Sequence, residues 1–255
     1  MKIGLMGAGA IGQYLLKHIN GNRENHMTVK SVFVRNIEKY KHLEETFHVK
    51  LFTDIHEFLE SDIDIVVEAT NIETVEQYFH TIIKEKNMMS ISIGAFSDDT
   101  LLKIAQESDS HKLYLPSGGI GGLDLIQNAR ALGNIDTLTL TTRKPASSLT
   151  EEVLSEETII FEGSAKDAIA KYPKNMNISI ILSVAGIGTE NTKVVLVADP
   201  TIDKNIHNIE VSGEFGQASF TFVNDPLKEN PKTSALAALS IYATLERLED
   251  NIVIG

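Results

Sequence analysis

The sequence contains no cysteine among its 255 residues. This absence excludes a disulfide framework, a thiolate nucleophile and a metal held by cysteine. Basic residues are also scarce, since 23 Lys and Arg stand against 35 Asp and Glu and the net charge is −12. Nucleic acids and anionic membranes bind clustered cations, so neither is expected as a partner. The acidic excess is interpreted as a solubility feature of the surface.

Long apolar segments are missing as well. No run reaches the roughly 18 residues that cross a bilayer, and Met1 leads directly into an apolar strand, which leaves no room for a signal peptide. No acidic cluster has the spacing of metal ligands, so no metal is expected. We therefore expect a soluble, cytoplasmic protein with a small-molecule partner. The chain is long enough for one large domain or two smaller ones.

A glycine-rich motif organises the beginning of the chain. Residues 7–12 read Gly-Ala-Gly-Ala-Ile-Gly, between a short apolar strand and a segment of helical periodicity that ends near Ile19. In such a unit Gly7 permits a tight turn, Gly9 lets the backbone approach a pyrophosphate, and Gly12 allows close packing of helix and strand. The helix N-terminus offers N–H groups to the phosphates. The context predicts a dinucleotide site, whereas the glycines alone would indicate only a turn.

The end of the next expected strand, residues 28–34, bears on cofactor choice. A dinucleotide fold usually has an acidic residue there, about 20 residues after the glycines, which binds the ribose 2′-hydroxyl. Here the position is Val34, followed by Arg35 and Asn36. Without a carboxylate to repel a 2′-phosphate, and with a guanidinium beside it, the site is expected to accept NADP. If Arg35 only stacks on the adenine, NAD and NADP would both be usable.

Strands and helices alternate through the first half of the chain. This order predicts an α/β fold with an N-terminal Rossmann-type, doubly wound parallel sheet. Ligands of such sheets bind at the C-terminal ends of the strands. Ala69 and Gly94, near two of these ends, are therefore candidate cofactor contacts, together with Ala10 and Ile11 of the glycine motif. Further strands are expected at 49–52, 64–70, 88–95 and 112–116, and helices at 37–48, 54–60, 72–86 and 101–107.

The pattern changes after a glycine-rich loop at 117–124, which is followed by a helix over 125–132. Residues 136–142 and 218–223 alternate apolar and polar side chains, which is typical of half-buried strands. We expect a second α+β domain with an open, mainly antiparallel or mixed sheet. The expected domains are 1–117, with a C-terminal helix from 233 packed back on it, and 118–232. Strands are also expected at 158–161 and 194–198, and helices from 164 and at 177–185.

One of the eight histidines stands apart from the others. His207 lies at the entry to a strand in the second half, while the other seven lie on helices, loops or strand approaches in the first half. A histidine titrates near neutrality and can exchange a proton during catalysis. From spacing alone, His207 is either catalytic or paired with a neighbouring acid. Cations and hydroxyls that could bind anions lie at Arg143 and Lys144, after a strand, and at Lys232, Thr233 and Ser234, at an expected helix N-terminus.

Several of these motifs, in this order, resemble the L-aspartate dehydrogenase family along essentially the whole chain. They are the glycine motif at 7–12, Leu-Pro-Ser-Gly-Gly-Ile-Gly-Gly-Leu-Asp at 115–124, Thr-Arg-Lys-Pro at 142–145, Phe-Glu-Gly at 161–163 with Pro-Lys-Asn-Met-Asn at 173–177, Ala-Asp-Pro at 198–200 with Asn-Ile-His at 205–207, and Asn-Pro-Lys-Thr-Ser at 230–234.

The resemblance implies oxidation of L-aspartate by NADP or NAD to iminoaspartate, which yields oxaloacetate and ammonia or feeds pyridine-nucleotide synthesis. It implies that His207 is catalytic and that Asn177 contacts the cofactor. It implies a similar contact for the residue after Ser-Gly in the glycine loop, often Ala in the family and Gly119 here. The two substrate carboxylates need cations or a helix N-terminus, for which Arg143, Lys144, Lys232, Thr233 and Ser234 are candidates.

Two other functions fit the same patterns. One is a related two-domain dehydrogenase of the homoserine or dihydrodipicolinate type. The other is a dinucleotide-binding sensor without catalysis. We also expect a homodimer through the second domain, because an open sheet needs its uncovered face or edge protected.

Overall fold

The computed structural model describes residues 1–22, 26–97, 99–131, 133, 135–227 and 230–252. The chain divides into two compact units: Met1–Pro116 together with most of the C-terminal helix, from Ala238, and Ser117–Ala237. Each unit contains its own sheet. Among the described helices, none combines the length and apolar character needed to cross a membrane.

The first unit is built on a six-stranded sheet with the order β3-β2-β1-β4-β5-β6, in which every pair is parallel. β1 lies between β2 and β4, so the strand order reverses there, and this is where doubly wound sheets bind ligands. The sheet confirms the Rossmann-type prediction. Its strands are β1 (Lys2–Met6), β2 (Thr28–Phe33), β3 (Lys50–Phe52), β4 (Ile65–Glu68), β5 (Asn87–Ser90) and β6 (Leu113–Tyr114).

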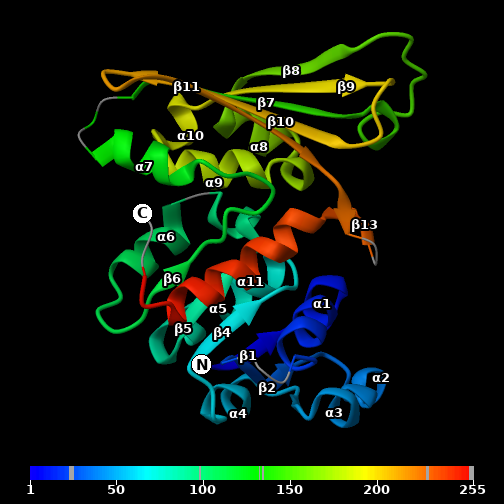
Figure 1. Cartoon of the computed structure of the whole chain (residues 1–255), viewed down its shortest axis with the longest axis vertical. Coiled ribbons are helices and arrows are strands. Elements are labelled where there is room, and N and C mark those ends of the chain that lie inside the picture. Colours follow the sequence, from blue (N-terminus) through cyan, green and yellow to red (C-terminus); the bar gives the residue numbers. More distant parts are fainter. Residues whose placement is uncertain (23–25, 98, 132, 134, 228–229, 253–255) are drawn as a thin grey trace. The chain divides into compact units, whose positions relative to one another are not determined.

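Apolar side chains cover both faces of this sheet and form two buried clusters. Ile241 and Leu245 of the C-terminal helix α11 (Ala235–Glu249) join the cluster that contains Leu5 and Leu16, and Glu249 pairs with the N-terminal ammonium at 3.1 Å. Phe58 and Phe79 lie in the other cluster. The remaining helices are α1 (Ala10–Ile19), α2 (Ile37–Tyr40), α3 (His42–Phe47), α4 (Ile55–Glu60), α5 (Ile72–Glu85) and α6 (Asp99–Gln106), shown in Figure 1.

The strand predicted over 88–95 is wrong at its C-terminal end. β5 stops at Ser90, and Ile93–Phe96 form a 3-10 helix, η1. The Ser92 N–H donates to the Glu68 carboxylate at 3.1 Å, and the Ala95 N–H donates to the Ser92 carbonyl. Because one of these N–H groups donates to a side chain and the other to its own turn, neither continues the sheet ladder, and the backbone turns.

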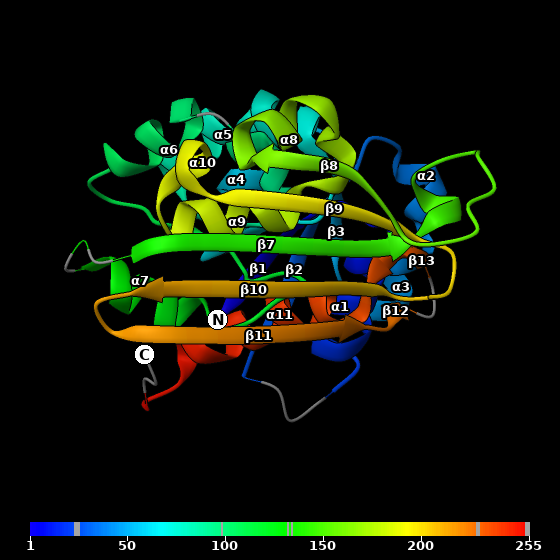
Figure 2. The same cartoon turned by 90° about the horizontal axis from the view of Figure 1, so that it is seen from above.

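The second unit contains a five-stranded sheet with the order β11-β10-β7-β9-β8. Only β7 and β9 are parallel, so the sheet is mixed, as one of the predicted forms. Helices cover one of its faces in Figure 1, and Figure 2 looks onto the other face, over which no described helix of this unit lies. The strands are β7 (Ile135–Pro145), β8 (Thr158–Ser164), β9 (Lys193–Asp199), β10 (Asn205–Gly213) and β11 (Gly216–Asn224).

The C-terminal helix begins later than predicted. Asn230–Ser234 form a strand, β13, paired antiparallel with β12 (Pro226–Leu227), and α11 starts at Ala235. The Ala235 N–H donates to the Asp225 carbonyl at 2.9 Å, which closes the ladder. The other helices of this unit are α7 (Leu123–Ala131), α8 (Ala165–Lys171), α9 (Asn177–Ala185) and α10 (Gly188–Asn191), with short 3-10 turns at Ala146–Ser148 and Pro173–Asn175.

Candidate functional site

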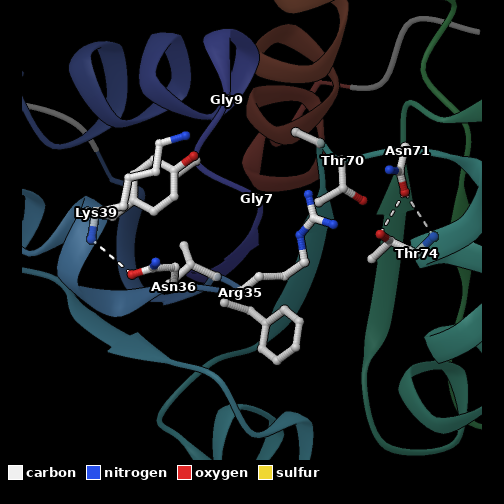
Figure 3. Close-up of a pocket in the computed structure, with 13 residues that line it drawn as sticks. Gly7, Gly9, Arg35, Asn36, Lys39, Thr70, Asn71 and Thr74 are labelled. Carbon is white, nitrogen blue, oxygen red and sulfur yellow. Dashed lines mark hydrogen bonds between the residues drawn. The ribbon is translucent and has the colours of Figure 1, made fainter.

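A cavity of about 380 Å³ opens at the C-terminal ends of β1, β2 and β4 in the first unit. The glycine turn lines one side, and Figure 3 shows Asn36 and Lys39 facing Thr70, Asn71 and Thr74 across it. Gly7, Gly9, Arg35, Asn36 and Ala69 were expected at this site, and all five line the cavity. Further lining comes from Ala8, Phe33, Val34, Lys39, Tyr40, Thr70, Asn71 and Thr74.

The glycine turn fits a pyrophosphate for steric reasons. Gly7 has φ +100°, and a Cβ there would meet the Ala69 carbonyl oxygen at 2.7 Å. A Cβ on Gly9 would meet no protein atom within 4 Å, so it would project into the space that a ligand needs. Gly9 is also the N-cap of α1, whose first N–H groups have no intrahelical acceptors. The residues present therefore suit a dinucleotide.

Two cationic side chains, Arg35 and Lys39, line the cavity and follow the C-terminal end of β2 in the chain. Arg35 extends toward Thr70 in Figure 3. The Lys39 ammonium lies 5.1 Å from the centre of the Tyr40 ring, and both residues line the cavity. Asn36 accepts the Lys39 N–H at 3.1 Å and so caps α2. Val34 lines the cavity where dinucleotide sites often have an acid, so this region is positively charged.

Some predicted contacts do not line this cavity. Ala10, Ile11 and Gly12 belong to α1. A Cβ on Gly12 would collide with the Gly7 carbonyl oxygen, which supports the expected role of Gly12 in helix packing. Gly94 is buried in η1. Asn71 and Thr74 were missed by sequence reasoning, although Asn71 caps α5 and an N-cap directly after a strand was a detectable signal.

His207 lies on β10 in the second unit and is only 4% exposed. It pairs in register with Thr142 of β7, and its Nδ1 lies 3.1 Å from the Thr142 hydroxyl. Burial, together with the nearby Lys144 ammonium, lowers the pKa of His207 from 6.5 to about 4. The ring is therefore neutral at physiological pH, and its partner in the described part of the chain is a hydroxyl rather than the acid that was the alternative.

Lys144 and Arg143, adjacent on β7, have different environments. Lys144 donates to Asn175 Oδ1 at 2.8 Å, and burial lowers the pKa of its amine. Alternation along the strand places it on the same face as Thr142. Arg143 donates to Asp199 at 3.0 Å and also pairs with Glu157, which raises its pKa. Of the ion pairs between described residues, none includes Lys144.

The remaining predicted contacts lie elsewhere in the second unit. Asn177 is exposed at the start of α9, and the buried Gly119 accepts the Asn224 side-chain N–H at 2.8 Å through its carbonyl. Ser234 accepts the Leu236 N–H at 3.2 Å, so it caps α11. The side chains of Lys232 and Thr233 lie outside the described part, and their backbone belongs to β13. Among the described residues, no group of three or more His, Asp or Glu could hold a metal.

Known proteins resemble this chain over its whole length. A family model described as aspartate dehydrogenase, C-terminal, matches residues 124–248, and one described as homoserine dehydrogenase, NAD binding domain, matches residues 7–116. The L-aspartate dehydrogenase of Methanospirillum hungatei is 38% identical, and that of Methanocaldococcus jannaschii 35% identical, each over 100% of this chain and 99% of the relative. The crystal structure of aspartate dehydrogenase from Thermotoga maritima superposes with a TM-score of 0.80 at 30% identity, covering 100% of this chain and 99% of that one.

Proposed function

Because this chain belongs to the L-aspartate dehydrogenase family, we propose that it oxidises L-aspartate with NAD(P) to iminoaspartate, which water hydrolyses to oxaloacetate and ammonia. The observation that best supports this proposal is the cluster of the buried His207 and Thr142 with the half-buried Lys144, which lies in the segment matched by the aspartate dehydrogenase model. NAD(P) bound at the glycine turn supplies the acceptor for the hydride that leaves the substrate α-carbon.

His207 is the residue that we assign to proton transfer. Loss of hydride from the α-carbon requires that the amine lose a proton, and a neutral imidazole can accept one. The ring is neutral because its pKa is lowered to about 4. For Nε2 to accept this proton, Nδ1 carries the ring hydrogen and donates it to the Thr142 hydroxyl oxygen, a contact that also orients the ring.

Lys144 is the cation that we assign to a substrate carboxylate. Its ammonium has an amide partner, Asn175, and no ion pair within the described chain, whereas Arg143 is already paired with Asp199 and Glu157. Ser234, Lys232 and Thr233 stay candidates for the second carboxylate. Asn177 and Gly119 stay proposed cofactor contacts, on the resemblance of their motifs.

Steady-state turnover tests the proposed function. Purified protein is mixed with L-aspartate, L-homoserine and other amino acids, each with NAD and with NADP, and the absorbance of the reduced nicotinamide is followed. We expect turnover with L-aspartate to exceed that with homoserine. Turnover with homoserine alone would favour a homoserine-type dehydrogenase, the alternative suggested by the family model that matches residues 7–116. Binding of a dinucleotide without turnover of any amino acid would favour the sensor.

We propose that NADP is used at least as well as NAD. Val34 cannot repel a 2′-phosphate, and Arg35 and Lys39 at the same cavity attract it. Replacing Val34 with Asp adds a carboxylate that accepts from the ribose hydroxyls of NAD and repels the phosphate of NADP. The ratio of kcat/KM values should move toward NAD by roughly 1–3 kcal/mol. A wild-type enzyme that uses NAD and ignores NADP would contradict this proposal.

A homodimer through the uncovered sheet face of the second unit is proposed for the assembly. Val223 on β11 is 58% exposed and Ile159 on β8 is 59% exposed. Exposed apolar side chains on a sheet face favour burial against a second copy, and a two-fold axis would let the same face pair with itself.

We further propose a cytoplasmic location and a supply of iminoaspartate to pyridine-nucleotide synthesis. Cell fractionation, and NAD auxotrophy of a deletion strain, would test these two points.

A further inference from the structure

The Glu68 carboxylate at the end of β4 is completely buried, with 0% exposure, directly behind the wall of the dinucleotide cavity. Five uncharged donors surround it. Oε1 accepts from the Thr70 N–H at 2.5 Å, the Thr70 hydroxyl at 2.8 Å and the Ser92 hydroxyl at 2.8 Å. Oε2 accepts from the Ser90 hydroxyl at 2.7 Å and the Ser92 N–H at 3.1 Å.

Burying a carboxylate is costly unless donors saturate it. A pair of apolar residues could have joined β4 and β5 without this cost. The donors instead link two places that the sheet brings together: the turn after β4 and the turn after β5, which leads into η1. Through the two donors of Ser92, Glu68 thus holds the turn after β4 against the turn after β5.

The residues of that turn form the cavity wall. Ala69, Thr70 and Asn71 all line the cavity. Thr70 also packs against the glycine turn, since its Cγ2 lies 2.5 Å from where a Cβ of Gly7 would be. A shift of Thr70 would therefore reach both the wall and the turn that receives the pyrophosphate.

We propose that Glu68 is a positioning residue for the cofactor: it fixes Thr70, and through Thr70 the glycine turn, in the arrangement that binds the dinucleotide. The proposal rests on the proposed function only in its need for a dinucleotide at this cavity. It does not depend on which amino acid is oxidised.

Glutamine cannot replace Glu68 in this role. Its amide NH₂ would stand at one of the two oxygen positions, and each of them faces a backbone N–H, that of Thr70 or that of Ser92. Hydroxyl donors can rotate to accept a hydrogen bond, but a backbone N–H cannot. Either orientation of the amide therefore displaces one of the two turns.

Titration of the purified full-length chain with NADPH and with NADH, followed by calorimetry, tests the proposal. We expect Glu68→Gln to raise the Kd of both nucleotides at least tenfold, measured well below its Tm. Ser90→Ala is the matched control, because it removes one buried donor to Glu68 and leaves both bonds to Thr70 intact. Its Kd should stay within twofold of wild type. In kinetics, Glu68→Gln should raise the KM for the nucleotide more than it lowers kcat at saturating nucleotide.

A folded Glu68→Gln protein with a wild-type Kd overturns the proposal. So does an equal loss of affinity in Ser90→Ala, because the effect would then come from a loosened core. If Glu68→Gln does not fold, Glu68→Asp decides, since it keeps the charge but withdraws the carboxylate by one methylene. We expect it to weaken nucleotide binding as well, and wild-type affinity would overturn the proposal. A wild-type chain that binds neither nucleotide contradicts the proposed function instead.

Discussion

His207 owes its proposed role to its surroundings rather than to its position in the sequence. An exposed imidazole would be about half protonated near pH 6.5. Burial on β10 and the Lys144 charge lower the pKa of His207 to about 4, so the ring stays a neutral proton acceptor through the physiological range. The Thr142 hydroxyl at Nδ1 adds an orienting contact from the neighbouring strand.

Replacing His207 with Ala is expected to lower kcat by about 10²–10⁴-fold, the usual span for a lost general base. Nucleotide affinity should survive, because the glycine turn that would hold the phosphates belongs to the first unit. A protonated ring cannot accept a proton, so activity falls as the pH drops through the pKa of His207. With that pKa at about 4, kcat/KM between pH 5 and 8 should have no acid limb due to this residue.

Kinetics of His207→Ala and His207→Asn at saturating cofactor provide the check. Near-normal kcat in the alanine variant would remove His207 from the reaction. An asparagine variant with normal kcat and raised KM would indicate contact with a substrate carboxylate instead. A wild-type limb near pH 6.5 that the alanine variant lacks would contradict the lowered pKa.

Lys144 and Arg143 form a matched pair of cations for a second test. Lys144→Met should raise the KM for L-aspartate by about 10–100-fold, the equivalent of roughly 1.5–3 kcal/mol for a charged hydrogen bond. Burial lowers the pKa of Lys144 below the ordinary lysine value of 10.5. As the pH is raised, the wild-type enzyme should therefore lose this cation, and its KM for L-aspartate should increase, before the pH reaches 10.5. Arg143→Met should mainly lower Tm, because Asp199 loses its cation. A larger effect of Arg143→Met on KM would reverse the assignment.

At the scale of elements, two glycines of the β1–α1 connection have different expected roles: Gly9 in nucleotide binding and Gly12 in the packing of α1. Gly9→Ala adds a methyl that meets no protein atom within 4 Å, so Tm should fall only slightly, through the poorer helix N-cap, while nucleotide affinity falls strongly. Gly12→Ala drives a methyl into the Gly7 carbonyl, so α1 must move away from β1 and Tm should fall by several degrees. Thermal melts and nucleotide titrations of the two variants check this. A Gly12→Ala protein with unchanged Tm would contradict the packing role.

At the scale of the whole molecule, the proposed dimer predicts a mass of twice the 28.0 kDa chain at micromolar concentration. Val223→Lys puts a charge on the exposed sheet face and should shift the protein toward monomer. Val153→Lys is the control, because Val153 is fully exposed outside the strands. Sedimentation velocity of all three proteins decides. A monomeric wild type would refute the dimer and leave the fold unaffected.

Local signals in the sequence were sufficient for most of the fold. The order of strands and helices, the glycine turn before α1 and the helix over Asn177–Ala185 were predicted correctly, because periodicity and turn chemistry act between residues close in the chain. The strand end at Ser90 and the start of α11 were predicted wrongly. Each boundary depends on a partner that local patterns do not show. The end of β5 depends on the Glu68 carboxylate, which accepts the Ser92 N–H, and the start of α11 depends on the pairing of β13 with β12.

The chemistry of the candidate site was decided by tertiary structure. Arg143 and Lys144 are indistinguishable in the sequence, but pairing of β7 with β9 brings Asp199 to Arg143, and pairing of β7 with β10 brings His207 to Thr142 and near Lys144. Glu68 and Ser92 meet only because β4 and β5 lie side by side. Residue type and spacing determine which groups are available. Burial and long-range partners determine which of them are charged, neutral or already paired, because desolvation and electrostatic contacts exist only in the folded chain.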